Sequence, residues 1–195
     1  VVGLNLSIGG GSFKVWRIFS RGRVECAAYV SISPVLSYIQ RGIVSAQVMM
    51  SLSPSPLERL NRARADLRMG LPVVLTSGSE GALVVSAEVL TTERLDDLRR
   101  IGTPVVALTA RRAETLKARA YDGDLARVAL PADAGVAWIE ALADPADDLT
   151  HPMKGPLISV RDGNASLHRA AIRLVKSAQL LPSAVVVALP MAMEF

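Results

Sequence analysis

Apolar and polar residues alternate with two different periods along the chain after residue 52. Apolar side chains recur every three or four positions in the first stretch, at Leu57, Leu60, Ala63 and Leu67. This spacing predicts a helix with one buried stripe. Short β-branched runs bounded by Gly, Ser, Thr or Pro predict buried strands instead. The alternation of the two patterns predicts an α/β fold, with a mixed β-sheet covered by helices on its faces.

The expected elements follow one another with short connections. Strands are predicted at 73–75, 83–85, 105–108, 125–130, 157–160 and 184–189. Helices are predicted from Pro56 to a stop at Gly70, and at 92–100, 133–142 and 167–180, with a further helix beginning after Thr109. Ser55 and Thr92 are the expected N-caps of the first two, because their hydroxyls can accept a hydrogen bond from a backbone N–H of the first turn.

A polar segment at 76–82 separates the first two predicted strands. We expect it to be a loop at a sheet edge, and such loops are where strand scaffolds commonly present catalytic or binding groups. Glu80 is the carboxylate of this loop and is therefore a candidate remnant of a catalytic site. The alternative interpretation is a solvated carboxylate in a polar turn.

The proportions of charged and aromatic residues change sharply near residue 49. Residues 1–48 contain five Lys or Arg residues against one acidic residue, Glu25, and five of the eight aromatic residues. The remaining residues carry equal numbers of basic and acidic side chains. We therefore predict a basic leader at 1–48 outside the domain, and a domain at 49–195.

This distribution limits the classes of partner. The sequence pI of about 9.6 comes from the leader, and the balanced domain argues against a nucleic-acid-binding protein. The apolar segment 24–50 is interrupted by Glu25, Pro34, Gln40 and Arg41, so no membrane span is expected. One cysteine and no export signal predict a cytoplasmic protein.

Residues 80–88 read Glu-Gly-Ala-Leu-Val-Val-Ser-Ala-Glu. They are similar to a Glu-Gly-Asp-Leu stretch ending in Ala-Ala-Glu in 3,4-dihydroxy-2-butanone 4-phosphate synthase, an enzyme of riboflavin biosynthesis. Residues 92–116 and 166–189 resemble the helices and strands that follow in that family. The resemblance covers about residues 57–189 and implies the family's α/β/α arrangement around a mixed sheet.

Two further motifs are Tyr-Asp-Gly-Asp at 121–124 and His-Pro-Met-Lys-Gly-Pro at 151–156. They resemble the degenerate copy of this domain at the N-terminus of alphaproteobacterial-type GTP cyclohydrolase II. This resemblance implies the N-terminal domain of a riboflavin-pathway protein whose zinc-dependent, GTP-hydrolysing domain follows it.

Departures from both families limit the activity that the resemblance implies. The synthase family binds a divalent metal with an acidic run before its Glu-Gly, but here Thr-Ser-Gly-Ser at 76–79 stands in that place. The family's metal-binding His aligns with Leu167, and His168 is one residue later, which is a rotation of about 100° on a helix. His168 is thus a second candidate remnant of a catalytic site. The alternative interpretation is a residue that caps the helix or lies on the surface.

The zinc site implied for GTP cyclohydrolase II needs three cysteines, and this chain has only Cys26. We therefore expect a fragment without cofactors, whose partners are the missing C-terminal zinc domain and a second copy in a homodimer. No metal ligands are predicted; Asp122 and Asp124 can pair on a metal or form turns around Gly123.

The proline-rich motif at 151–156 is either a rigid loop or a contact site. In the second interpretation, Lys154 and Arg161 contact a phosphorylated ligand or the neighbouring zinc domain. The sequence therefore predicts a non-catalytic domain with a scaffold, dimerisation or regulatory role in a GTP cyclohydrolase II. The alternative is a divergent synthase that acts on ribulose 5-phosphate with magnesium through an altered loop.

Overall fold

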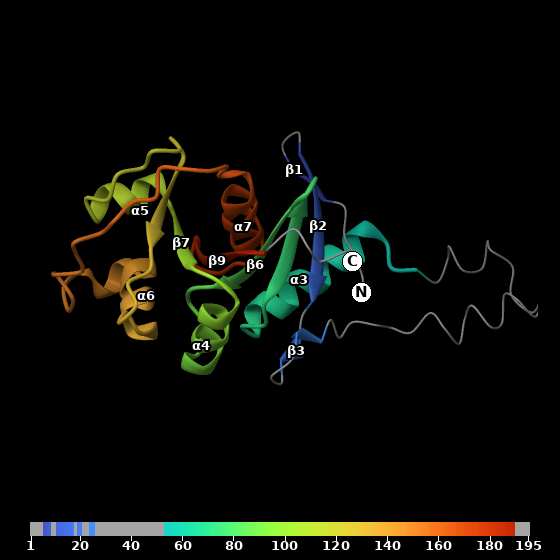
Figure 1. The fold of residues 1–195 in the computed structure, drawn as a ribbon, viewed down its shortest axis with the longest axis horizontal. Helices are drawn as coiled ribbons and strands as arrows, with labels where there is room; N and C mark the ends of the chain where they lie inside the picture. Colours follow the sequence, from blue (N-terminus) through green and yellow to red (C-terminus); the bar gives the residue numbers. More distant parts are fainter. Residues whose placement is uncertain (1–5, 9–10, 18, 21–23, 26–52, 190–195) are drawn as a thin grey trace, which may run out of the picture.

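The computed structural model describes residues 6–8, 11–17, 19–20, 24–25 and 53–189 (Figure 1). Its main feature is a seven-stranded sheet with the order β1-β2-β5-β6-β9-β7-β8. These strands are β1 (Leu6–Ile8), β2 (Gly11–Arg17), β5 (Val73–Ser77), β6 (Glu80–Ser86), β7 (Pro104–Thr109), β8 (Leu125–Ala129) and β9 (Ser183–Leu189). Two short strands, β3 (Phe19–Ser20) and β4 (Val24–Glu25), pair separately.

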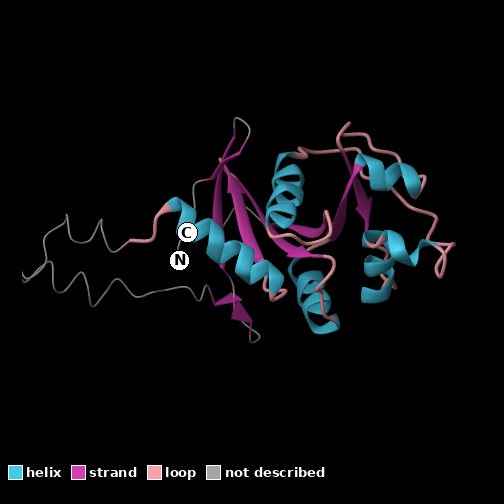
Figure 2. Cartoon of the chain, turned by 180° about the vertical axis from the view of Figure 1, so that it is seen from behind, coloured by secondary structure: helices cyan, strands magenta, loops and turns pink. Residues whose placement is uncertain are grey.

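The helices lie in two layers, one on each face of the sheet (Figures 1 and 2). They are α3 (Pro56–Arg68), α4 (Thr92–Ile101), α5 (Ala110–Thr115), α6 (Val136–Ala143) and α7 (Ser166–Ser177), with a 3₁₀ helix, η1, at Pro145–Asp148. Helices α3 and α7 share one apolar core with the sheet, whereas α4, α5 and α6 share the other. The predicted α/β class with a helix-covered sheet is confirmed.

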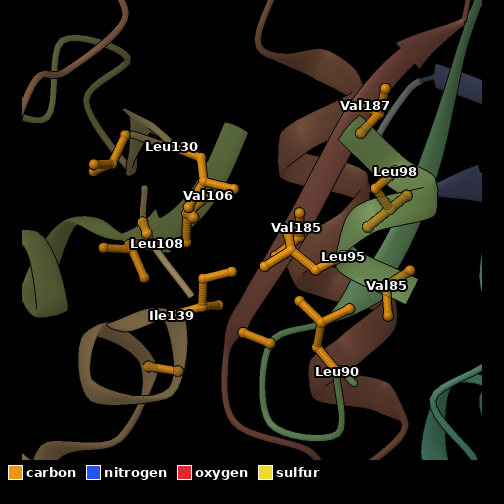
Figure 3. Close-up of a cluster of buried hydrophobic side chains, with 14 of the residues drawn as sticks. Val85, Leu90, Leu95, Leu98, Val106, Leu108, Leu130, Ile139, Val185 and Val187 are labelled. Atoms are coloured by element: carbon orange, nitrogen blue, oxygen red, sulfur yellow. The ribbon is translucent and has the colours of Figure 1, made fainter. Parts of the chain in front are cut away.

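Strand residues alternate between these two cores. Val73 and Leu75 of β5 lie in the core under α3 and α7, while Val74 between them lies in the opposite core. Figure 3 shows the second core, where Leu95 and Leu98 of α4 lie beside Val185 and Val187 of β9. Because side chains of a strand point alternately to opposite faces, both faces of the central strands are buried and their sequences are almost continuously apolar.

Each pair of neighbouring strands within the described residues is antiparallel. The sequence predicts a mixed sheet. In the structure, the strand direction reverses from each described strand to the next. The alternation arises because β5 and β6 form a hairpin, β7 and β8 are antiparallel neighbours, and β9 runs between β6 and β7 antiparallel to both.

The segment predicted as a loop at 76–82 is a tight hairpin instead. Ser77 pairs with Glu80, so Gly78 and Ser79 alone form the turn. Gly78 has a φ of +57°, a conformation that glycine adopts without the strain of a side chain. The prediction of a long loop was wrong because the backbone ladder continues through the polar residues of both strands.

The predicted strand at 157–160 is also wrong. Only one bridge joins it to β8, between Ser159 and Val128, with Ala129 N–H donating to Ile158 O at 2.8 Å. No further bridge follows Val160 among the described residues; the chain bends at 162–163, where Arg127 Nη1 donates to the carbonyl of Asp162 at 2.7 Å.

The starts of α3 and α5 follow the capping chemistry of the sequence, and three other helix ends are shifted. Helix α6 begins at Val136 rather than at the predicted 133. Ser55 and Glu58 form a reciprocal capping box, in which Ser55 N–H donates to Glu58 Oε2 at 2.7 Å. The N-cap of α4 is Thr91 rather than the predicted Thr92, because Thr91 Oγ1 accepts from Arg94 N–H at 3.4 Å. Thr109 caps α5 as predicted. Helix α7 ends three residues before the predicted position 180, and Gln179 follows with a φ of +61°.

The second strand, β2, lies within the segment that the sequence sets apart as a leader. It pairs with β5 over the registers from Lys14 with Thr76 to Arg17 with Val73. The boundary at residue 48 stays a prediction. No helix in the described ranges combines the length and the apolar character needed to cross a membrane.

Candidate functional site

The β5–β6 hairpin and the start of α7 bring together two segments that are far apart in the sequence. Glu80 is exposed at the first position of β6, and Asn164 Nδ2 donates to Glu80 Oε2 at 3.4 Å. The Asn164 Oδ1 atom accepts from Ser166 N–H at 2.9 Å, at the first residue of α7. Asn164 therefore joins the hairpin to the helix, and the sequence analysis did not single it out.

His168 lies in the first turn of α7 and is largely buried. Its pKa is lowered to about 4, mainly by burial and also by the Arg127 guanidinium, while the Asp122 carboxylate opposes both. Its Nδ1 atom is buried without a hydrogen-bond partner among the described residues. The imidazole is therefore neutral at pH 7 and closer to a packed core residue than to a surface cap.

Arg127 is the buried charge of this region, with 3% of its surface exposed. Its guanidinium donates to both carboxylate oxygens of Asp122, at 2.8 and 3.1 Å. It also donates to the carbonyls of Asp162 and Gly163, in the segment that leads to α7. Arg127 positions this segment against β8. The sequence feature that could have identified Arg127 is an arginine inside an otherwise apolar strand.

The second carboxylate of the Tyr-Asp-Gly-Asp motif has a different partner. Asp124 accepts two hydrogen bonds from Arg169 of α7, at 2.7 and 2.6 Å. This hydrogen bonding from Arg169 holds the pKa of Asp124 below its usual value. Asp122 and Asp124 thus bind two different arginines, and they serve as anchors for α7 and its preceding loop.

Lys154, a candidate for contact with a ligand or a second domain, is 9% exposed. Its Nζ donates to Asp148 Oδ1, and Arg112 donates to both oxygens of the same carboxylate at 2.6 and 2.8 Å. The hydrogen bonds from Arg112, and then from Lys154, hold the pKa of Asp148 well below its usual range. Trp138 Nε1 also donates to the Lys154 carbonyl at 3.2 Å.

Arg112 completes this network with three backbone contacts at the end of α6. It donates to the carbonyls of Ala141, Leu142 and Asp144 at 3.0, 2.7 and 3.0 Å. The motif at 151–156 is therefore fixed at Lys154 by partly buried ion pairs, which agrees with a rigid loop. Arg161, the other candidate contact residue, is exposed and lies over Tyr121, with its Cζ 4.8 Å from the ring centroid.

The carboxylates at the hairpin and those that bind Arg127 and Arg169 do not fit a magnesium site. Magnesium prefers carboxylates and waters in octahedral geometry. The carboxylates of Asp122 and Asp124 are each held by an arginine, and Glu80 bonds to Asn164. In the described part of the chain, no three His, Cys, Asp or Glu side chains are grouped so that they could hold a metal ion. Cys26 lies outside the described residues.

Solved structures share this fold. The chain aligns with a cation-free 3,4-dihydroxy-2-butanone 4-phosphate synthase with a TM-score of 0.51 and 21% identity, over 67% of this chain and 74% of that one. It also aligns with a two-domain 3,4-dihydroxy-2-butanone 4-phosphate synthase from A. baumannii, with a TM-score of 0.50 and 16% identity, over 67% of this chain and 47% of that one. At these identities the likeness concerns the fold alone.

The chain also resembles a known protein in sequence. This chain is 30% identical over 144 residues to GTP cyclohydrolase-2 of Azospirillum brasilense, and the match covers 72% of this chain. The chain spans 37% of the length of that relative. No protein-family model matches the chain. The chain is therefore a domain with the fold of 3,4-dihydroxy-2-butanone 4-phosphate synthase, related in sequence to GTP cyclohydrolase-2.

Proposed function

We propose that this domain is a non-catalytic N-terminal part of a riboflavin-pathway GTP cyclohydrolase, with a scaffold, dimerisation or regulatory role. Its partners are then a C-terminal zinc-binding catalytic domain and a second copy of the domain. The domain itself uses no cofactor, and the protein is cytoplasmic, with no nucleic-acid or membrane partner. The sequence relationship to GTP cyclohydrolase-2 supports the pathway.

The observation that supports a non-catalytic role is the pairing of charged groups at β8 and the first turns of α7. Arg127 holds Asp122, and Arg169 holds Asp124, in bidentate contacts. A carboxylate that binds an arginine through both oxygens has its charge balanced and one lone pair of each oxygen occupied, so fewer positions remain for a metal ion or an incoming proton. Together with a neutral His168 that lacks a described partner, these contacts favour structural roles for the site.

The alternative function is a divergent synthase that acts on ribulose 5-phosphate with magnesium, and the shared fold favours it. The chain is incubated with ribulose 5-phosphate and Mg²⁺, and product is followed by mass spectrometry beside an active synthase as positive control. We expect no turnover. Turnover that is abolished by Glu80→Gln and retained in Glu140→Gln, at another exposed glutamate, would contradict the non-catalytic role.

A chimera tests the scaffold role directly. Residues 53–189 of this chain replace the matched segment of the A. brasilense GTP cyclohydrolase-2, and GTP hydrolysis with Zn²⁺ is measured. We expect the chimera to keep activity that is lost when the segment is deleted. Equal activity of the deletion variant and the parent enzyme would show that the segment supports neither folding nor catalysis.

A further inference from the structure

Large apolar side chains are exposed in one short stretch that follows η1. Leu149, Met153 and Ile158 are 93%, 91% and 68% exposed, and they are half of the large apolar side chains that the described ranges leave exposed. Single exposed apolar side chains are ordinary on a protein surface, but a group of them marks a contact site. We call residues 149–158 the apolar loop.

The first part of the apolar loop is closed by an ion pair. Asp148 directly precedes Leu149, Lys154 directly follows Met153, and Lys154 Nζ donates to Asp148 Oδ1. Arg112 donates to both oxygens of the same carboxylate and so fixes this closure to α5. The two most exposed apolar side chains are thus direct neighbours of two residues that are held together, and they stay at the same end of the domain.

Two further contacts anchor the rest of the apolar loop. Trp138 Nε1 of α6 donates to the Lys154 carbonyl at 3.2 Å. The Ala129 N–H of β8 donates to the Ile158 carbonyl at 2.8 Å, so the last residues of the loop follow the outer edge of the sheet. The backbone of the loop is therefore held in place before any partner binds, and little conformational entropy is lost when it does.

The apolar loop lies at a free end of the domain. In both views, the chain that follows α6 projects at the end of the domain opposite to β1 and β2 (Figures 1 and 2). Strand β8, which this chain segment borders, is the last strand of the described sheet on that side. A partner can therefore reach the loop without displacing a described helix.

The chemistry of the apolar loop selects an apolar protein surface as its partner. Residues 149–158 contain one Lys or Arg, Lys154, and no Asp or Glu. Because Lys154 is neutralised by Asp148, the loop offers no unpaired cation to a phosphorylated ligand or a nucleic acid. Exposed apolar side chains without free charge are typical of the buried centre of a protein interface.

The sequence relationship indicates which protein surface this is. The chain spans 37% of the length of the A. brasilense GTP cyclohydrolase-2, so most of that protein lies outside the match. The apolar loop also contains the His-Pro-Met-Lys-Gly-Pro motif, by which the chain resembles the copy of this domain in GTP cyclohydrolase II. The loop is thus a feature shared with proteins in which a catalytic domain accompanies this one.

We propose that the apolar loop is the docking site for the catalytic domain of the parent GTP cyclohydrolase. An apolar patch of that domain covers Leu149, Met153 and Ile158, and the Asp148–Lys154 ion pair holds the first two in position. The inference rests on the proposed function and deepens it, because it assigns a surface to the contact between the two domains.

Oxidation of methionine by hydrogen peroxide tests the docking site, because a methionine covered by a partner is oxidised more slowly than an exposed one. The full chain is compared with a chimera in which the full chain precedes the part of the A. brasilense GTP cyclohydrolase-2 outside the match. Mass spectrometry of peptides should show Met153 oxidised about tenfold more slowly in the chimera. Met69, 58% exposed at the end of α3, is the internal reference and should react at the same rate in both proteins.

A substitution beside Met153 identifies the contact that protects it. Leu149→Asp in the chimera should return the oxidation rate of Met153 to that of the full chain. Leu57→Asp, at a leucine of α3 that is 64% exposed, is the matched control and should leave the protection intact. Since both leucines are exposed, neither substitution removes a core contact.

Three outcomes would overturn the docking site. They are equal oxidation of Met153 in the chimera and the full chain, protection that Leu149→Asp leaves intact, and protection in the full chain that rises with its concentration. The last outcome would assign the apolar loop to a contact between two copies. GTP hydrolysis by the chimera is measured separately, and hydrolysis with an unprotected Met153 would remove the docking site while the proposed function stands.

Discussion

The guanidinium of Arg112 binds both carboxylate oxygens of Asp148, 36 positions later in the sequence, at 2.6 and 2.8 Å. Arg112 is 8% exposed and also donates to three carbonyls at the end of α6. This one side chain therefore fixes α5, α6 and η1 relative to one another. The contact makes Arg112 a central residue for the stability of this end of the domain.

Replacement of Arg112 by methionine should lower the free energy of unfolding by about 2 to 4 kcal/mol, because Asp148 and the three carbonyls lose a charged donor while the apolar stem is kept. Arg111→Met, at the exposed neighbouring position, is the matched control and should change stability by no more than about 0.5 kcal/mol. Urea unfolding followed by circular dichroism measures both. Equal effects of the two substitutions would show that the network contributes little.

The lowered pKa of Asp148 predicts a loss of stability in acid. A carboxyl group whose pKa is lower in the folded state stabilises the fold above its unfolded pKa, about 3.9, and this contribution disappears as the pH falls through the folded value. We expect the free energy of unfolding to decrease below about pH 4, and to decrease less steeply in Asp148→Asn. Asp133→Asn, at an exposed carboxylate, should show the same dependence of the free energy of unfolding on pH as the parent protein. Urea unfolding at pH 2.5 to 6, in roughly half-unit steps, tests this dependence.

His168 predicts a second pH dependence at higher pH. Its folded pKa of about 4 lies below the unfolded value of about 6.5, so the unfolded chain binds more protons between these values. The sign follows directly: stability should rise with pH from about 4 to about 6.5, by about 2 to 3 kcal/mol, and be lost as the pH falls across that window.

His168→Gln should flatten this slope, whereas His151→Gln, at the exposed second histidine, should leave it unchanged. Urea unfolding between pH 4 and pH 7.5 supplies the comparison. A slope that persists in His168→Gln would assign the proton uptake to another group.

Gly70 ends the first described helix with a φ of +70°. A Cβ atom there would lie 2.5 Å from the carbonyl oxygen of Val89 and would also meet Arg94 Nη1. Gly70→Ala should therefore destabilise the fold by about 2 to 3 kcal/mol, through both left-handed strain and a clash with backbone.

Gly78→Ala is the matched control, because Gly78 has a φ of +57° and no atom within 4 Å of the added Cβ. It should cost only the conformational strain, about 1 kcal/mol. Thermal unfolding of the two variants makes the comparison. Similar losses in both would show that the Val89 carbonyl moves away at little cost.

The sequence predicts the elements of this fold better than it predicts the contacts at the candidate site. Capping residues and apolar periods are local, so Ser55, Thr109 and the strands around Val106 and Val186 could be located from the sequence. The turn at Gly78 could not, because polar strand residues at the end of a hairpin resemble a loop until their partners are known. The failure at 157–160 has the same origin, since an apolar run alone does not show whether a neighbouring strand is available.

Some residues of the candidate site could be identified from the sequence, and others could not. Glu80 and His168 were identified from motifs, and both lie beside the start of α7. Asp122 with Arg127 and Arg112 with Asp148 are long-range or buried pairs, and nothing in the local sequence identifies the partner of each charge. Lys154 was a candidate for contact with a ligand or a neighbouring domain, beside the interpretation of a rigid loop. In the structure its Nζ pairs with Asp148 and its carbonyl accepts from Trp138, and its contact role stays a prediction.

The position of β9 has a consequence for the order of synthesis. This strand is formed by the last described residues, yet it lies between β6 and β7 and is the described strand that pairs with both. While the chain is being made, β5 with β6 and β7 with β8 are two separate hairpin-like units with open inner edges. They can join only after residues 183–189 have left the ribosome. Between the synthesis of β8 and that of β9 the chain thus exposes two apolar strand edges, and protection by chaperones is expected to matter during this interval.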